Sequence, residues 1–193
     1  MADYAVNRRI TLLPLLASAA LTVAACGGST PGTASPTSSA TSTTSGSSTG
    51  SSDAANKLLQ TDPCSLLSSS VLSQYGLGAG KSSNDAGARS CGWQKPTDNN
   101  GNGYTLGVDI WDSLGIKDID PSSNTITDDP INGRPAKQTQ DKVGDVCAVV
   151  LGVTDSSRVD VQVNESNSDM SQACQEANQF AKIIGPELPG GNG

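Results

Sequence analysis

Apolar side chains recur every three or four residues from Met170 to Ile184, the spacing that places them on one face of an α-helix. Asp169 precedes this stretch as an N-cap residue with Gln172 at the third helical position, and Gly185-Pro186 ends it. The pattern predicts an amphipathic helix near the C-terminus. Its apolar positions are Met170, Ala173, Cys174, Ala177, Phe180, Ala181 and Ile184.

Three stretches before this helix have the patterns of β-strands. Residues 104–111 alternate apolar side chains with others, the period of a strand that is buried on one face. Residues 146–153 form a nearly continuous apolar run, as in a central strand, and residues 158–164 alternate again after a polar turn at 154–157. The second and third stretches predict a β-hairpin.

A shorter helix is predicted at the start of the folded region. Asp62 fits its N-cap and Pro63 its first turn, Ser68 caps a second turn, and Gly76 ends it. Together with the strands, the two helical regions predict an α+β fold, an antiparallel β-sheet packed by an N-terminal helix and a C-terminal helix. The apolar side of this first helix carries Leu67, Val71, Leu72 and Tyr75.

The N-terminal 25 residues have the pattern of a secretory signal peptide. Arg8 and Arg9 precede residues 10–25, which carry no charge. This stretch is shorter than the about 20 apolar residues of a transmembrane helix, and Pro14 interrupts it. General secretion is the default export route, and the two arginines leave twin-arginine export open as an alternative.

The predicted cleavage site ends in Val23-Ala24-Ala25-Cys26, which resembles the bacterial lipoprotein lipobox. That resemblance implies that Cys26 receives a diacylglyceryl group before the signal is cleaved. Two acyl chains anchor a protein durably, because each buried methylene contributes about 0.8 kcal/mol. We therefore expect residues 1–25 to be a lipoprotein signal peptide and Cys26 to be the lipidation site.

The chain after Cys26 begins with a low-complexity stretch, since residues 27–52 are only Gly, Ser, Thr, Pro and Ala. Such a composition offers no large apolar group to offset the entropy of ordering. We expect residues 26–55 to be the lipidated cysteine and a disordered linker, and residues 56–193 to be one globular α+β domain. O-glycosylation of the linker is an open alternative to a plain spacer.

Composition excludes several function classes. The 193 residues include 12 Lys and Arg against 19 Asp and Glu, which is a formal net charge of -7, and only 3% are aromatic. An acidic chain with few aromatic residues does not match a nucleic-acid binder. Histidine is absent, so the usual Ser-His-Asp and Cys-His catalytic systems and His-ligated metals are excluded.

Four cysteines follow Cys26, and an even number in an exported domain is typical of disulfides. Three pairings are possible. We favour the sequential pairs, because each then ties a predicted helix to a strand, and in the chain-entropy model each loop contributes roughly 3–4 kcal/mol. The favoured pairs are Cys64 with Cys91 and Cys147 with Cys174.

Other polar groups offer weaker candidates for chemistry. Asp98, Asn100 and Asn102 match the first half of a calcium loop, with Asp109 at its twelfth position, but a polar turn explains the same residues. We therefore expect no metal and no cofactor. Trp111, opposite the apolar face of its strand, is a candidate for ligand stacking, and Trp93 is expected in the core.

A loop between the predicted strands contains two groups of carboxylates. They could act as an acid–base pair on a glycan, with one of them kept protonated by its surroundings. The simpler interpretation is that they are solvated loop residues. The carboxylates belong to Asp118, Asp120, Asp128 and Asp129.

Several short motifs in a fixed order resemble a family of uncharacterised actinobacterial lipoproteins that carry a domain of unknown function. The resemblance extends from Asp62 to Pro189 and implies a cell-envelope lipoprotein with two disulfides. It implies no catalytic residues. The motifs are Asp62-Pro63-Cys64-Ser65-Leu66-Leu67, Tyr75-Gly76-Leu77-Gly78, Cys91-Gly92-Trp93, Asn132-Gly133-Arg134-Pro135-Ala136, Cys147 at a valine-rich strand and Cys174 in an alanine-rich helix.

These observations predict a membrane-anchored extracytoplasmic lipoprotein, held on the cell membrane by its lipidated cysteine. We expect the domain to be a non-catalytic binding or accessory module that meets an envelope protein or a small ligand, and no nucleic acid. The ligand-binding residues are not predicted. The alternative is a carrier or hydrolase that acts on cell-wall lipid or glycan.

Overall fold

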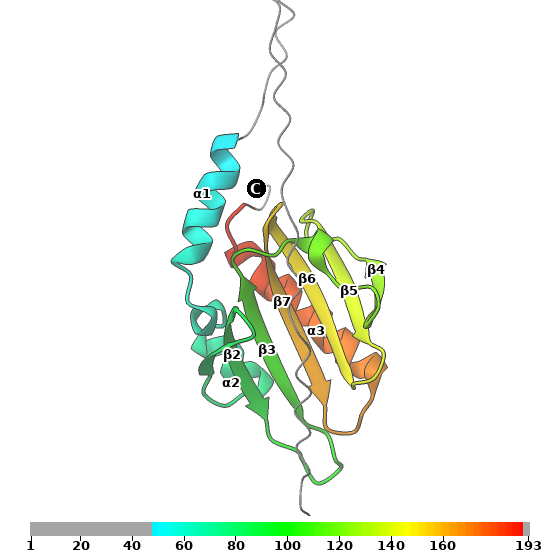
Figure 1. The fold of residues 1–193 in the computed structure, drawn as a ribbon. Coiled ribbons are helices and arrows are strands. Elements are labelled where there is room, and N and C mark those ends of the chain that lie inside the picture. Colours follow the sequence, from blue (N-terminus) through cyan, green and yellow to red (C-terminus); the bar gives the residue numbers. More distant parts are fainter. Residues whose placement is uncertain (1–47, 191–193) are drawn as a thin grey trace, which may run out of the picture. The chain divides into compact units, whose positions relative to one another are not determined.

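Strands dominate the computed structural model, which describes residues 48–190; Cys26 and the predicted signal peptide lie outside the described residues. One antiparallel sheet has the strand order β1-β2-β3-β7-β6-β5-β4 (Figure 1). The strands are β1 (Lys81–Asp85), β2 (Ala88–Lys95), β3 (Tyr104–Trp111), β4 (Asn124–Asp128), β5 (Ala136–Asp141), β6 (Val146–Thr154) and β7 (Ser157–Glu165).

One face of this sheet carries α3 (Met170–Ile184) and the short 3₁₀ helix η1 (Pro63–Leu66). α3 lies along β6 and β7 (Figure 1), and the Asp169 side chain accepts a hydrogen bond from the Gln172 amide at 3.0 Å. η1 packs on β1, β2 and β3. This is the predicted α+β fold. The remaining helices are α1 (Ser48–Leu59), α2 (Ser69–Tyr75), η2 (Ile116–Asp118) and η3 (Gly185–Glu187).

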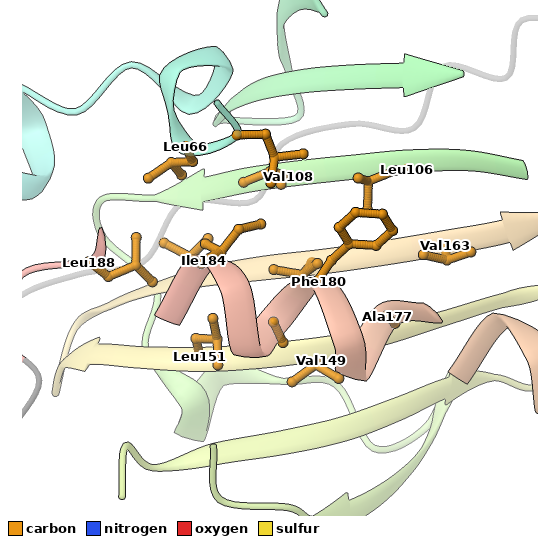
Figure 2. Packing of buried hydrophobic residues seen from close by; sticks show 14 of the residues in the cluster. Leu66, Leu106, Val108, Val149, Leu151, Val163, Ala177, Phe180, Ile184 and Leu188 are labelled. Carbon is orange, nitrogen blue, oxygen red and sulfur yellow. The ribbon is translucent and has the colours of Figure 1, made fainter. Parts of the chain in front are cut away.

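The core lies between the sheet and this helical layer (Figure 2). Phe180 of α3 is fully buried between them, and its ring lies 4.8 Å from that of Tyr75 and 6.1 Å from that of Tyr104. Alternate residues of β3, β6 and β7 point into the same layer, as the apolar periodicity predicted. On β3 and β7 the opposite face of the sheet carries mainly polar side chains, among them Asp109, Asp160 and Gln162, whereas on β6 it carries small and apolar ones.

Helix α1 extends the folded domain toward the N-terminus beyond the predicted boundary. It begins at Ser48, so the boundary at residue 56 lies inside it and residues 48–55 of the predicted linker are helical. Ala54 and Leu58 are buried one turn apart. The Arg89 guanidinium donates to the Leu58 and Thr61 carbonyls at the end of the helix. A glycine- and serine-rich helix start is thus held by tertiary contacts.

Both predicted disulfides are confirmed. Cys64–Cys91 joins η1 to β2, with a Cα–Cα distance of 5.1 Å. Cys147–Cys174 joins β6 to α3, with a Cα–Cα distance of 5.0 Å. Each bridge therefore ties the helical layer to the sheet, which was the reason for favouring the sequential pairing.

Candidate functional site

A groove opens between α3 and the strand next to those that it covers. Gln138 and Gln140 of β5 are the register partners of Val149 and Cys147 on β6, so their side chains point to the face on which α3 lies. The groove has a volume of about 840 Å³. Its lining residues are Gln138, Gln140, Met170, Ser171, Cys174, Gln175, Asn178, Gln179 and Lys182.

Carboxamide side chains make up most of this lining, and we call it the carboxamide groove. The Gln140 amide donates to Cys174 Sγ at 3.4 Å, and the Asn178 amide donates to the Asp129 carboxylate. The side chain of Gln138 has no hydrogen-bond partner among the described residues. A carboxamide has two donors and two acceptor lone pairs, so the groove retains donors and acceptors for a ligand.

The lining of the groove carries little charge. None of the described lining residues is an acid, and Lys182 at one end is the one base among them. Acid–base catalysis needs titratable groups within hydrogen-bond reach of the reacting atoms. The groove is therefore suited to binding by hydrogen bonds.

A pair of carboxylates lies on the opposite face of the sheet. Asp109 of β3 and Asp160 of β7 are register partners. The Gln162 amide donates to Asp109 at 2.6 Å, and Arg158 pairs with Asp160 at 2.9 Å. Burial raises the pKa of Asp160 to about 6 against the lowering effect of Arg158, and the Asp109 charge adds to the rise.

A smaller trough of about 350 Å³ lies beside this pair. Gly92 and Gly107, which are register partners, leave its floor without side chains, and Asp109, Trp111 and Gln162 contribute to its lining. A Cβ at Gly107 would lie 2.9 Å from the Gln162 side chain. Trp111, the candidate for ligand stacking, is half-buried here and lies on the face opposite the apolar side of its strand.

The structure separates the residues of the candidate calcium loop. Both oxygens of Asp98 are engaged within the loop, by the Asn100 and Asn102 amides at 2.8 and 2.9 Å and by the Asn102 side chain at 3.3 Å. These hydrogen bonds lower the pKa of Asp98. Asp109 lies five residues into an extended strand from Tyr104, about 17 Å along the chain. The turn interpretation fits this geometry.

The four loop carboxylates bind different partners. The Asp118 carboxylate accepts from the Gly115 amide, Asp120 from Ser122 and Ser123, Asp128 pairs with Lys137, and Asp129 accepts from Asn178. Each of the four carboxylates thus has its own partner, as solvated or structural loop residues do. Trp93 is buried, with its indole and Cys91 both next to Gly80.

Two further observations concern the part of the chain from residue 48 to residue 190. No group of three or more His, Cys, Asp or Glu side chains is placed there to hold a metal ion. No helix there has the length and hydropathy to span a bilayer.

Sequence reasoning missed the carboxamide groove. Its signal is the alternation of Gln138 and Gln140 in Ala136–Asp141, together with Gln175 and Asn178 three residues apart on the last helix. Polar residues at helical spacing indicate a solvated face in most proteins. Only the sheet order shows that this face borders β5, so the groove requires the fold to be known.

The fold and the groove define a class of protein, a disulfide-tied α+β domain with an open polar groove between the last helix and an outer strand of the sheet. The chain belongs to a family described as protein of unknown function (DUF3558), whose model matches residues 21–186. No curated protein and no solved structure matches the chain.

Proposed function

We propose that this protein is a lipid-anchored, non-catalytic binding module on the outer face of the cell membrane, and that its carboxamide groove holds a neutral, hydroxyl-rich ligand of the cell envelope. The groove carries the proposal. Vicinal hydroxyls need paired donors and acceptors, and Gln138, Gln175 and Asn178 supply them from two elements. Apart from Lys182, the lining groups are neutral, and they favour a neutral glycan over a charged polymer.

The position of the groove on rigid elements supports this role. Gln138 and Gln140 are held by the sheet, and the Cys147–Cys174 bridge ties α3 to β6 beneath the groove. A site on helices and strands holds its polar groups in place, so little entropy is lost when a ligand binds.

The experiment is a glycan-binding measurement with matched variants. The domain is purified from its own envelope and examined by native mass spectrometry, and the retained ligand is titrated by calorimetry. Gln138→Ala and Gln175→Ala should each weaken binding about five- to tenfold, the loss expected from one or two hydrogen bonds. Gln94→Ala, an exposed glutamine outside the groove, is the control. Unchanged affinity in both groove variants would contradict the proposal.

The anchoring part rests on the sequence around Cys26 and is supported by the two disulfides, which are typical of oxidising compartments. Cys26→Ala should leave the protein in the soluble fraction, and radiolabelled palmitate should label only the unaltered chain. Label in the Cys26→Ala chain would show that the lipid is attached elsewhere. Cys26→Ala does not touch the groove, so failure of this part leaves the binding proposal testable by itself.

The alternative function, a hydrolase acting on cell-wall glycan, is favoured by one observation. Asp109 and Asp160 are cross-strand neighbours, with Cβ atoms about 4.5–5.5 Å apart, and the pKa of Asp160 is raised to about 6. The ion pair with Arg158 opposes this role because it holds the Asp160 carboxylate. Release of reducing sugar from purified cell wall that is lost in Asp109→Asn would favour the hydrolase.

A further inference from the structure

At the end of the sheet where β7 leads into α3, three side chains place oxygen atoms in the interior without hydrogen-bond partners. Tyr104 and Glu165 are register partners across β3 and β7, and each is only 2% exposed. The Tyr104 hydroxyl and both carboxylate oxygens of Glu165 lack partners. Glu176 of α3 is the third residue, and its Oε2 is likewise buried and unpartnered.

These side chains meet in the layer between the sheet and α3. Tyr104 and Glu165 continue the rows of buried residues on β3 and β7, so both point to the face that α3 covers. Glu176 lies one turn before Phe180, whose ring is 6.1 Å from that of Tyr104. Burial raises the pKa of Glu165 and of Tyr104, and the charge of Glu176 raises both further.

The surrounding charges leave this cluster electrostatically unbalanced. The charge of Lys95 lowers the pKa of Glu165. However, the Lys95 Nζ lies over the Tyr104 ring, 5.1 Å from its centroid, and forms no ion pair among the described residues. Asp169 adds a further negative charge near Glu165. Carboxylates buried without donors are strongly unfavourable. One shared proton supplies a single donor, which leaves most of the oxygens unpaired.

We propose that Glu165 and Glu176, with the neutral Tyr104 hydroxyl beside them, form a binding site for a hard divalent cation of the calcium type. Calcium takes six to eight oxygen ligands, and carboxylates bind it with one or both oxygens. The two glutamates balance its charge and supply up to four oxygens, the phenol supplies another, and water completes the shell. The fully buried, unpartnered Tyr104 hydroxyl is an observation independent of the two acids.

The expected affinity is that of a weak extracellular site. Two carboxylates are fewer than tight calcium sites use, and calcium affinity decreases when fewer of the ligands are charged. A dissociation constant of roughly 10⁻⁴–10⁻³ M therefore follows, the range of extracellular modules. This site does not depend on the proposed glycan groove, which lies on the other side of α3 and shares none of these residues.

The experiment measures cation binding to the oxidised full-length chain by calorimetry with calcium and by luminescence with Tb³⁺. Tyr104 at the site should sensitise Tb³⁺ emission, and calcium should displace it. Glu165→Gln and Glu176→Gln should each weaken calcium binding at least about tenfold, since each removes a charged ligand. Calcium at about 5 mM should raise the melting temperature of the unaltered chain and not that of Glu165→Gln.

Two comparisons make the result decisive. Glu165→Gln removes a buried charge, so its melting temperature without calcium should be no lower than that of the unaltered chain, which separates lost binding from lost folding. Asp98→Asn, in the loop that resembles a calcium motif, should bind calcium as the unaltered chain does. The proposal is overturned if no cation binds up to about 10 mM. It is also overturned if binding survives in both glutamate variants.

Discussion

Arg134 shows how one residue of a short sequence motif can have a purely structural role. Its side chain is buried, and its guanidinium donates to the carbonyls of Gly152 at 2.8 Å, Leu188 at 2.9 Å and Pro189 at 3.2 Å. Burial lowers the pKa of this guanidinium. Arg134 thereby connects the segment after α3 to the end of β6, which gives this residue of the motif Asn132–Ala136 a structural role.

Loss of these contacts should be costly. Arg134→Ala should lower the free energy of unfolding by about 3 kcal/mol, because hydrogen bonds from a charged donor are worth about 1.5–3 kcal/mol each and buried carbonyls are left unpaired. Denaturant titration measures this loss. Lys142→Ala is the matched control, since the exposed Lys142 ammonium also donates to two carbonyls, those of Pro121 and Ser122. A similar cost for both variants would contradict the assigned role.

Asp160 should give the domain a specific pH dependence. Its pKa is about 6 in the folded chain against 3.8 for the unperturbed group, so folding favours the protonated form. This contribution is present below pH 3.8 and is lost as the pH rises through 6. Relative to Asp160→Asn, which does not titrate, the unaltered chain should lose about 2–3 kcal/mol between pH 4 and pH 7. A difference between the two unfolding free energies that stays constant over this range would refute the prediction.

The role of a single residue was predictable from the sequence where its hydrogen-bond partner lies within one helical turn of it. Asp62, Ser68 and Asp169 cap their helices as predicted, each accepting a backbone amide two or three residues ahead. The environment of Asp109 was not predictable in the same way. Its partners, Gln162 and the neighbouring Asp160, come from a strand about 50 residues away, so they depend on the register of β3 with β7.

Elements were predictable to the extent that they carry their own apolar pattern. The strands at 104–111 and 146–154 and the helix at 170–184 match because their buried faces are continuous. By contrast, β1, β4 and β5 have the sequences KSSND, NTITD and AKQTQD, and are outer strands of the sheet. Backbone hydrogen bonds to a neighbouring strand hold these strands in the sheet. Such bonds leave no periodic pattern of large side chains in the sequence, so the strands could not be predicted from it.

Helix α1 offers a matched pair of variants at the element scale. Leu58 is fully buried whereas Leu59 is 53% exposed. Leu58→Ala should lower the free energy of unfolding by about 2–4 kcal/mol, because it leaves a cavity against the core, and Leu59→Ala should change it by less than about 0.5 kcal/mol. Chemical denaturation of the two variants compares them directly. Equal, small effects would mean that α1 does not belong to the cooperative fold, as the predicted boundary at residue 56 implied.

At the scale of the whole molecule, the arrangement of layers decides where a ligand has access. α3 lies over β6 and β7 near the centre of the sheet, so β5 and β4 extend beyond its edge (Figure 1). The carboxamide groove is a consequence of this offset. The class of fold could be predicted from the sequence. The offset could not, because it depends on the number and order of the strands, and the outer strands have no distinct apolar pattern in the sequence.

The two disulfides should make folding of the whole domain depend on an oxidising compartment. Each closes a loop with a sequence separation of 27 residues and contributes about 3.5 kcal/mol in the chain-entropy model. Together they supply about 7 kcal/mol, comparable with the 5–15 kcal/mol of net stability of most domains.

Complete reduction should therefore lower the melting temperature by about 15–25 °C, as measured by circular dichroism with and without reductant. The double variant Cys147→Ala/Cys174→Ala, which keeps Cys64–Cys91, should show about half of that loss under oxidising conditions. Because the bridges connect the sheet to η1 and to α3 separately, their effects should add. A reduced chain that melts at the same temperature as the oxidised one would remove the support that the disulfides give to the proposed extracytoplasmic location.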